Sequence, residues 1–281
     1  MSSSEIVNAL TVDVEEYYHA LVFREGAPDA VSGSLESRVE VSTGRVLALM
    51  AAREVKATFF ILGQVASDHP SIVQKIAGEG HEIACHGYAH EPVSRQTPGE
   101  FRADIRRAKA VLEDIVGEPV VGYRAPNFSI GPAQAWAYDV LLEEGFRYDS
   151  SVYPILHDSY GDRTAPRFPY EVRRNGEGLL IQVPIGTARV LGMNLPLGGG
   201  GYFRLLPSAL FRSGIRRVNT QERQPVVFYF HPWELDPDQP RPAMPWRHRF
   251  RHYVGMGREE VKLSGLLRDV RFSTVRSVFG L

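Results

Sequence analysis

The sequence predicts an α/β fold in which strands and helices alternate around a parallel sheet or a barrel. Short apolar runs of strand type, such as residues 57–62, are followed by segments with one apolar helical face. Pro70 opens one of these helices, and Gly78 and Gly80 end it. This alternation continues from residue 6 to residue 148 and is typical of parallel sheets and (β/α) barrels.

The other elements of the first half follow the same pattern. Thr97, Pro98 and Glu100 predict a helix start, with Thr97 as the cap and Glu100 in position for a capping box. We expect strands at 6–12, directly before His86, at 120–123 and at 146–148. We expect helical segments around 46–50, at 97–116 and at 132–144, and a polar linker rich in Gly and Ser up to about residue 40.

The second half is less regular. Residues 158–169 form a polar, Pro-containing loop, and the four glycines at 198–201 indicate a flexible or tightly turned loop. Residues 240–253 read as an arm rich in Pro and Arg. Strands are expected at 179–183 and 224–230, helices at 210–218 and 259–267, and a strand at the end of the chain.

Composition limits the classes of function. The chain has 281 residues, 43% of them hydrophobic, which is enough for one sizeable core. A net charge of −1 recruits neither nucleic acid nor an anionic membrane, and no apolar run is long enough for a membrane span. The single cysteine, Cys85, allows no internal disulfide, and residues 1–5 do not resemble a signal peptide. We therefore expect a cytoplasmic protein, either free or peripheral to the inner membrane.

Polar side chains follow directly on the predicted strands. His86 and His90 are four residues apart, a spacing that lets two imidazoles hold one metal ion while a third ligand leaves a position open for water. In a barrel the carboxyl ends of the strands converge on one mouth. The side chains at these ends are Asp13, Glu15, His86, His90, Arg124, Asp149 and His231.

Other candidates are weaker. His248 and His252 have the same spacing, but they lie among arginines and favour a basic surface arm over a second metal site. Cys85 is interpreted as a small buried residue rather than a ligand. The glycine run 198–201 lacks the Gly-Lys-Ser/Thr of a phosphate loop.

Four motifs, in the right order, resemble the polysaccharide deacetylases of carbohydrate esterase family 4, the NodB-homology group. They are Thr11-Val-Asp13, His86-x-x-x-His90, Arg124-Ala-Pro126 and Tyr229-Phe-His231. The resemblance implies a distorted (β/α) barrel of about seven strands, related to TIM barrels, with an irregular C-terminal extension. It implies one catalytic domain over residues 1–281, with a core at 6–235 and an arm, helix and strand at 236–281. Residues 198–207 and 231–237 also resemble deacetylases of exopolysaccharide loci with exosortase (PEP-CTERM) systems.

The resemblance also implies a mechanism. One divalent ion, zinc first and otherwise cobalt, manganese or nickel, is held by His86, His90 and a carboxylate. Val14 stands where the family usually has a second aspartate, so this carboxylate is either Glu15 or Asp13. The remaining roles are Asp13 as base, His231 as acid, Arg124 orienting Asp13, Asp149 orienting His231, and Asn127, Tyr153 and Trp233 in substrate binding. Trp233 is either a core residue or a platform for a sugar ring.

The expected reaction is removal of N-acetyl groups, as acetate, from N-acetylhexosamine units of a polysaccharide or of a lipid-linked glycan precursor. Two alternatives remain at this stage. One is a cyclic-amide hydrolase or aminosugar deformylase on the same scaffold, and the other is a carbohydrate-binding relic without activity. Less than about half an equivalent of bound ion after reconstitution would favour a metal-free variant of the first kind, and indifference to replacement of Asp13 and His231 would favour the second.

Overall fold

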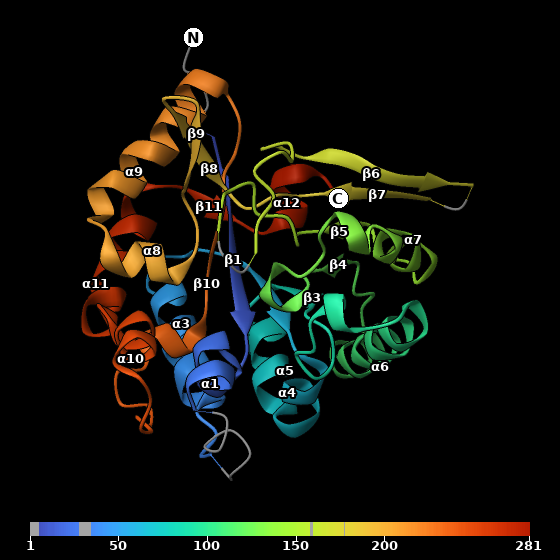
Figure 1. Cartoon of the computed structure of the whole chain (residues 1–281), viewed down its shortest axis with the longest axis horizontal. Helices are drawn as coiled ribbons and strands as arrows, with labels where there is room; N and C mark the ends of the chain where they lie inside the picture. The colour runs from blue at the N-terminus through green and yellow to red at the C-terminus, as the bar shows by residue number, and fades with distance from the viewer. Residues whose placement is uncertain (1–5, 28–34, 158–159, 177) are drawn as a thin grey trace.

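A computed structural model describes residues 6–27, 35–157, 160–176 and 178–281 (Figure 1). The predictions for residues 1–5, for part of the polar linker (28–34) and for residues 158–159 lie outside the described residues.

The fold is organised around seven parallel strands in the order β10-β1-β2-β3-β4-β5-β7. Two further strands join them, β6 antiparallel to β7 and β11 parallel to β1. The bounds are β1 Asn8–Val14, β2 Thr58–Ile61, β3 Glu82–Cys85, β4 Gly122–Tyr123, β5 Tyr148–Asp149, β6 Tyr170–Asn175, β7 Gly178–Gln182, β10 Val227–Phe230 and β11 Phe272–Ser273.

The chain after β7 links the two ends of this parallel series. Val183 N donates to the carbonyl of Asp149 in β5 at 2.7 Å, and Gly186 N donates to the carbonyl of Val227 in β10 at 2.9 Å. A Cβ on residue 186 would lie 2.8 Å from that same carbonyl oxygen, so the close approach requires glycine. The predicted distorted barrel is therefore confirmed, and an irregular segment rather than a regular strand closes it.

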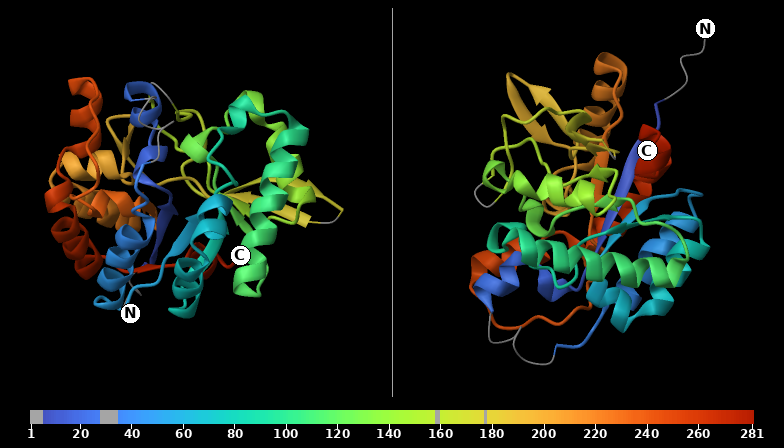
Figure 2. Two further views of the ribbon diagram at one scale, coloured as in Figure 1. Left: turned by 90° about the horizontal axis from the view of Figure 1, so that it is seen from below. Right: turned by 90° about the vertical axis from the view of Figure 1, so that its right-hand side faces the viewer.

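Helices cover the outside of the first five strands (Figure 2). They are α3 Val39–Ala51, α4 Gly63–Asp68, α5 Pro70–Gly78, α6 Pro98–Val116 and α7 Trp136–Glu143. The predicted capping box of α6 is present, since Thr97 Oγ1 accepts from Glu100 N and Thr97 N donates to Glu100 Oε2. One apolar cluster fills the space between strands and helices, and a second fills the barrel interior.

The second half departs from the sequence prediction in several places. Strand β6 was not predicted, and a helix at 275–279 follows the closing strand that was expected to end the chain. The glycine run 198–201 was expected as a loop, but it leads into a helix, α8. The Arg-rich arm contains a helix, α10, and the hairpin of β8 and β9 was not predicted. The remaining bounds are α1 Leu21–Gly26, β8 Thr187–Val190, β9 Met193–Pro196, α8 Gly200–Leu205, α9 Ser208–Arg217, α10 Trp246–Tyr253, α11 Met256–Asp269 and α12 Val275–Phe279.

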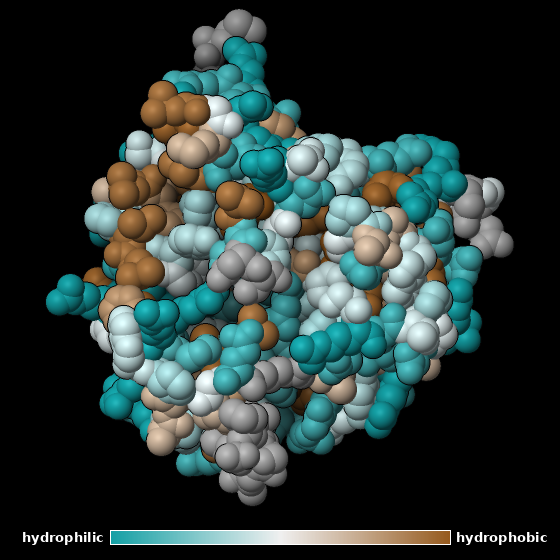
Figure 3. All heavy atoms as spheres, viewed as in Figure 1, coloured by the Kyte–Doolittle hydropathy of each residue, from teal (hydrophilic) through white to brown (hydrophobic). Residues whose placement is uncertain are grey.

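Exposed apolar side chains gather over α8 and α9, where Figure 3 shows brown spheres. Leu205 and Leu210 are 53% and 57% exposed. Among the described residues, no helix combines the length and the hydropathy that a membrane crossing needs.

Candidate metal and catalytic site

The end of β1 carries two carboxylates separated by one core residue. Val14 is fully buried in the cluster between strands and helices. Since successive side chains of a strand point to opposite faces, Asp13 and Glu15 both face the site, where they are 2% and 3% exposed. The valine that departs from the family pattern therefore packs into the core, and the second carboxylate stands one residue further on.

Glu15, His86 and His90 form the one group of three potential metal ligands found among the described residues. Their ligand atoms all lie within 4.8 Å of one another, and all three side chains are buried. His86 Nδ1 lies 2.8 Å from the carbonyl of Arg124, which leaves Nε2 as the atom offered to a metal. His90 Nε2 lies 2.6 Å from Glu15 Oε2. Asp13 is not a member of this group.

The local backbone and the electrostatics fit this donor set to a divalent cation. His90, in the loop that follows β3, has a φ of +56°, a strained value for a non-glycine residue. Burial lowers the pKa of His86 to about 4. Burial raises the pKa of Glu15, but the charges of His90 and His231 outweigh it and hold that pKa below its ordinary range. Neutral imidazole and ionised carboxylate are the forms that bind metal, and two N donors with one O donor suit zinc.

Asp13 is held by a fully buried arginine. Arg124 Nη1 donates to Asp13 Oδ1 at 2.6 Å and to Thr11 Oγ1 at 3.0 Å. Nε and Nη2 donate to the carbonyl and the hydroxyl of Ser150 at 3.2 and 2.9 Å. The guanidinium also lies 4.1 Å from the ring centroid of Phe60. Four polar contacts thus fix the guanidinium of Arg124, and the guanidinium in turn fixes one oxygen of Asp13.

His231 stands at the end of β10 beside the ligand group. Its Nε2 lies 3.6 Å from Glu15 Oε1, and its side chain is 21% exposed, against 2% for those of His86 and His90. Burial lowers the pKa of His231, but the carboxylates of Glu15 and Glu234 raise it to about 9. A molecule that arrives from solvent can therefore reach His231. The raised pKa favours the protonated form of the His231 imidazole.

The prediction that Asp149 orients His231 is wrong. Asp149 accepts from the backbone N and the hydroxyl of Ser151 at 3.0 and 2.5 Å, and burial raises its pKa to about 6. The carboxylate next to His231 Nδ1 is instead that of Glu234, with Oε1 at 2.8 Å. Glu234 lies three residues further on in a 3₁₀ turn, so the spacing in His231-Pro-Trp-Glu234 was a signal that sequence reasoning missed.

The three predicted substrate-binding residues have different surroundings. Trp233 is 6% exposed, its ring stacks on those of His231 and His252, and Nε1 donates to Glu15 Oε1 at 3.2 Å. It is a core residue that supports the site, and the sugar-platform alternative is wrong. Tyr153 is fully buried, and its hydroxyl donates to the carbonyl of Gly198 at 2.6 Å, so its polar group is engaged within the protein.

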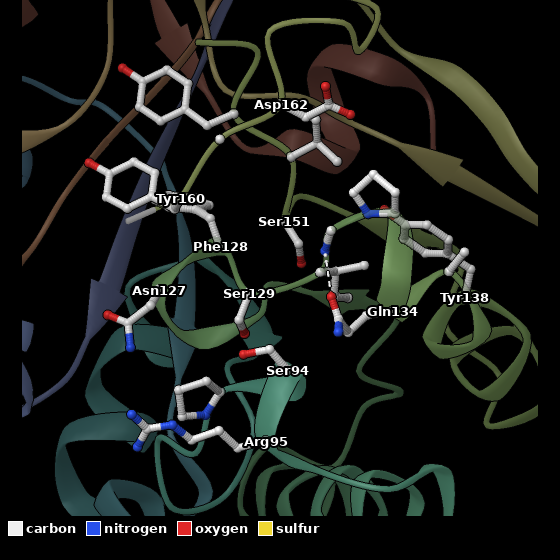
Figure 4. A pocket seen from close by; sticks show the side chains of 18 of the residues that line it. Ser94, Arg95, Asn127, Phe128, Ser129, Gln134, Tyr138, Ser151, Tyr160 and Asp162 are labelled. Atoms are coloured by element: carbon white, nitrogen blue, oxygen red, sulfur yellow. Dashed lines mark hydrogen bonds between the residues drawn. The ribbon is translucent and has the colours of Figure 1, made fainter. Parts of the chain in front are cut away.

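Asn127 differs from both. It has a φ of +55°, and among the described residues its buried Nδ2 has no hydrogen-bond partner. It lines a cavity of about 520 Å³, and Ser94, Arg95 and Tyr160 are among the other lining residues (Figure 4). None of the three ligand residues lines this cavity. Residues 124–127 connect the ligand group to this cavity. Arg124 donates to Asp13 beside the ligand group, and Asn127 lines the cavity.

The site is therefore a cluster of buried N and O donors at the carboxyl ends of parallel strands, with the carboxylate of Asp13 and the imidazole of His231 beside it. Comparisons with known proteins show which families the chain resembles. Residues 20–139 match the family described as polysaccharide deacetylase, and residues 150–280 match a family described as a domain of unknown function, DUF3473. Over residues 20–139 the chain is thus similar to polysaccharide deacetylases.

Individual relatives are distant. A peptidoglycan-N-acetylglucosamine deacetylase of Bacillus cereus is 29% identical over 130 residues, which cover 42% of this chain and 47% of the relative. A peptidoglycan deacetylase of Helicobacter pylori is 28% identical over 149 residues, 53% of this chain and 46% of the relative. The matched stretches thus span about half the length of these relatives. The crystal structure of a polysaccharide deacetylase from Mycobacterium smegmatis, itself assigned as putative, shares the fold, with a TM-score of 0.63 at 22% identity over 99% of this chain and 90% of the other.

Proposed function

We propose that the protein hydrolyses the N-acetyl group of an N-acetylhexosamine unit in a glycan, releasing acetate and a free amine. The observation that carries this proposal is the meeting of Glu15, His86 and His90 within 4.8 Å, with the imidazole of His231 3.6 Å from Glu15. The names of the two relatives support the class of substrate, since both are named as peptidoglycan deacetylases.

Glu15, His86 and His90 would hold one divalent ion, with zinc favoured by two imidazoles and a carboxylate. When bound, such an ion supplies Lewis acidity at the acetamide carbonyl and at the attacking water. The carboxylate of Glu15 and the fixed tautomer of His86 are the protein's contribution to placing it.

The side chains perform the proton transfers. Asp13, fixed by Arg124, takes the proton of the water that attacks the acetamide carbon. The N–H of Asn127, in its left-handed turn, is the candidate donor to the oxyanion. His231 gives its proton to the amide nitrogen as the C–N bond breaks, because an amine anion is a poor leaving group. The products are one carboxylate and one amine.

The substrate is proposed as an N-acetylhexosamine unit of a polysaccharide or of its lipid-linked precursor. The cavity supports the proposal of a glycan substrate, because hydroxyl, amide and aromatic groups line it around Asn127. Its arginine, Arg95, would suit an anionic group such as the diphosphate of a lipid carrier.

Acetate release from N-acetylated oligosaccharides, measured with purified protein before and after chelation and after zinc reconstitution, tests the proposal. We expect activity that chelation abolishes and zinc restores, with about one equivalent bound. Asp13→Asn should retain the metal and lose activity at least 100-fold. Zinc binding without acetate release from any N-acetylated glycan would overturn the proposed reaction while leaving the metal site intact.

A further inference from the structure

A buried ionic network lies behind His231, and all of it belongs to the second half of the chain. We propose that Glu234 is the positioning residue of His231 and that Arg204 holds Glu234 in place for this task. The proposal rests on the proposed function for the role of His231 as the acid. It also assigns a role in the active site to residues 150–280, the segment that matches a domain of unknown function.

One carboxylate oxygen holds both the ring and the backbone of His231. Glu234 Oε1 accepts from His231 N at 2.9 Å and lies 2.8 Å from His231 Nδ1. Since a carboxylate only accepts, the proton of the ring resides on Nδ1 when the imidazole is neutral. Nε2 is then the atom directed at Glu15, at 3.6 Å. Glu234 thereby determines which nitrogen exchanges protons with a bound molecule and where that nitrogen lies.

The second oxygen of Glu234 forms an ion pair with an arginine. Arg204 Nε lies 2.9 Å from Glu234 Oε2, and the two side chains are 3% and 0% exposed. Nη1 of Arg204 donates to the carbonyl of His252, so the guanidinium is anchored from the far side as well. A buried carboxylate without a cation would become protonated, and Arg204 keeps Glu234 ionised.

Gly200 makes room for this pair. A Cβ on Gly200 would lie 1.4 Å from Glu234 Oε2, so any side chain there displaces the carboxylate. At the adjacent Gly201 a Cβ would meet nothing within 4 Å. The glycine run 198–201 and the sequence His231-Pro-Trp-Glu234, which are far apart in the chain, are thus two halves of one arrangement. Gly200 leaves space for the carboxylate of Glu234, which lies in the turn after β10.

Direct observation of the His231 ring tests the proposal without any turnover. In ¹⁵N-labelled, zinc-reconstituted protein, the His231 resonances are assigned by their loss in His231→Ala. We expect a downfield Nδ1 proton, protected from exchange by Glu234 Oε1, in the parent protein. Glu234→Ala and Gly200→Ala should lose this protected proton, whereas Gly201→Ala, the matched control, should keep it.

Kinetics of acetate release give the second measurement. Glu234→Gln and Gly200→Ala should reduce kcat about 10- to 100-fold with KM changed less than about twofold, while Gly201→Ala stays at the parent value. Unchanged His231 resonances in both Glu234→Ala and Gly200→Ala would overturn the proposal, as would an unchanged kcat in Glu234→Gln. Absence of turnover in the parent protein would refute the proposed function alone, because the resonance measurement stands independently. If Glu234→Ala does not fold, Glu234→Gln and the glycine pair keep the test decisive.

Discussion

Removal of the Arg124 guanidinium should destabilise the protein mainly by leaving Asp13 as an unpaired buried charge. Arg124 is fully buried and makes four polar contacts, the shortest being 2.6 Å to Asp13 Oδ1. Breaking a buried ion pair by removing one partner costs about 3–5 kcal/mol, because the remaining charge has lost its compensation. We therefore expect Arg124→Met to lower the free energy of unfolding by that amount.

A double-mutant cycle separates this effect from lost packing against Phe60. Asp13→Asn removes the charge that Arg124 neutralises, so Arg124→Met should be at least 1–2 kcal/mol less costly in the Asp13→Asn background. The assay is urea unfolding at pH 7 of chelator-treated protein, followed by both fluorescence and circular dichroism so that coincident transitions support two-state analysis. An equal loss in the two backgrounds would refute the reasoning and assign the contribution of Arg124 to packing alone.

Three further predictions concern other parts of the molecule. Glu15→Gln should reduce zinc affinity at least tenfold, whereas Asp13→Asn should not, as equilibrium dialysis would show; equal losses would contradict the proposed ligand set. Gly44→Ala in α3 should stabilise the protein by about 0.5–1 kcal/mol in urea unfolding, because its new Cβ has nothing within 4 Å. Gly63→Ala should destabilise the protein by about 1–3 kcal/mol, because its new Cβ would lie 2.8 Å from the backbone of α6. Burial, followed by the charge of Glu234, raises the pKa of Glu259 from 4.5 to about 9. The folded protein therefore favours the neutral carboxyl, and the stability that it contributes below pH 4.5 is lost progressively as pH rises toward 9. Glu259→Gln should remove this loss and exceed the parent in stability at pH 8 but not at pH 4.5; an advantage independent of pH would contradict it.

The fold was accessible from the sequence because its main signals are local. Apolar runs of strand length and helical stripes alternate over residues 6–148, and the capping residues of α6 lie within four positions of one another. The carboxyl ends of parallel strands must converge, so the polar residues that follow β1, β3, β4 and β10 are brought to one mouth whatever the details of packing. The hairpin of β8 and β9 and the helices α8 and α10 lack signals of that strength.

The site was only partly accessible for the same reason. Strand alternation places Asp13 and Glu15 on one face, and the spacing of His86 and His90 marks them as a pair. The choice of Glu234 over Asp149 as the neighbour of His231 depends on a 3₁₀ turn and on the direction in which each carboxylate points.

The sequence by itself determined which polar side chains reach the barrel mouth, since this follows from the order of strands along the chain. Only the tertiary structure decided which of them touch, that Trp233 packs inward, and that Gly200 admits Glu234 beside Arg204. Contacts between residues distant in sequence depend on side-chain direction and on differences of an ångström in separation, and neither quantity is encoded in the periodicity of a single chain segment.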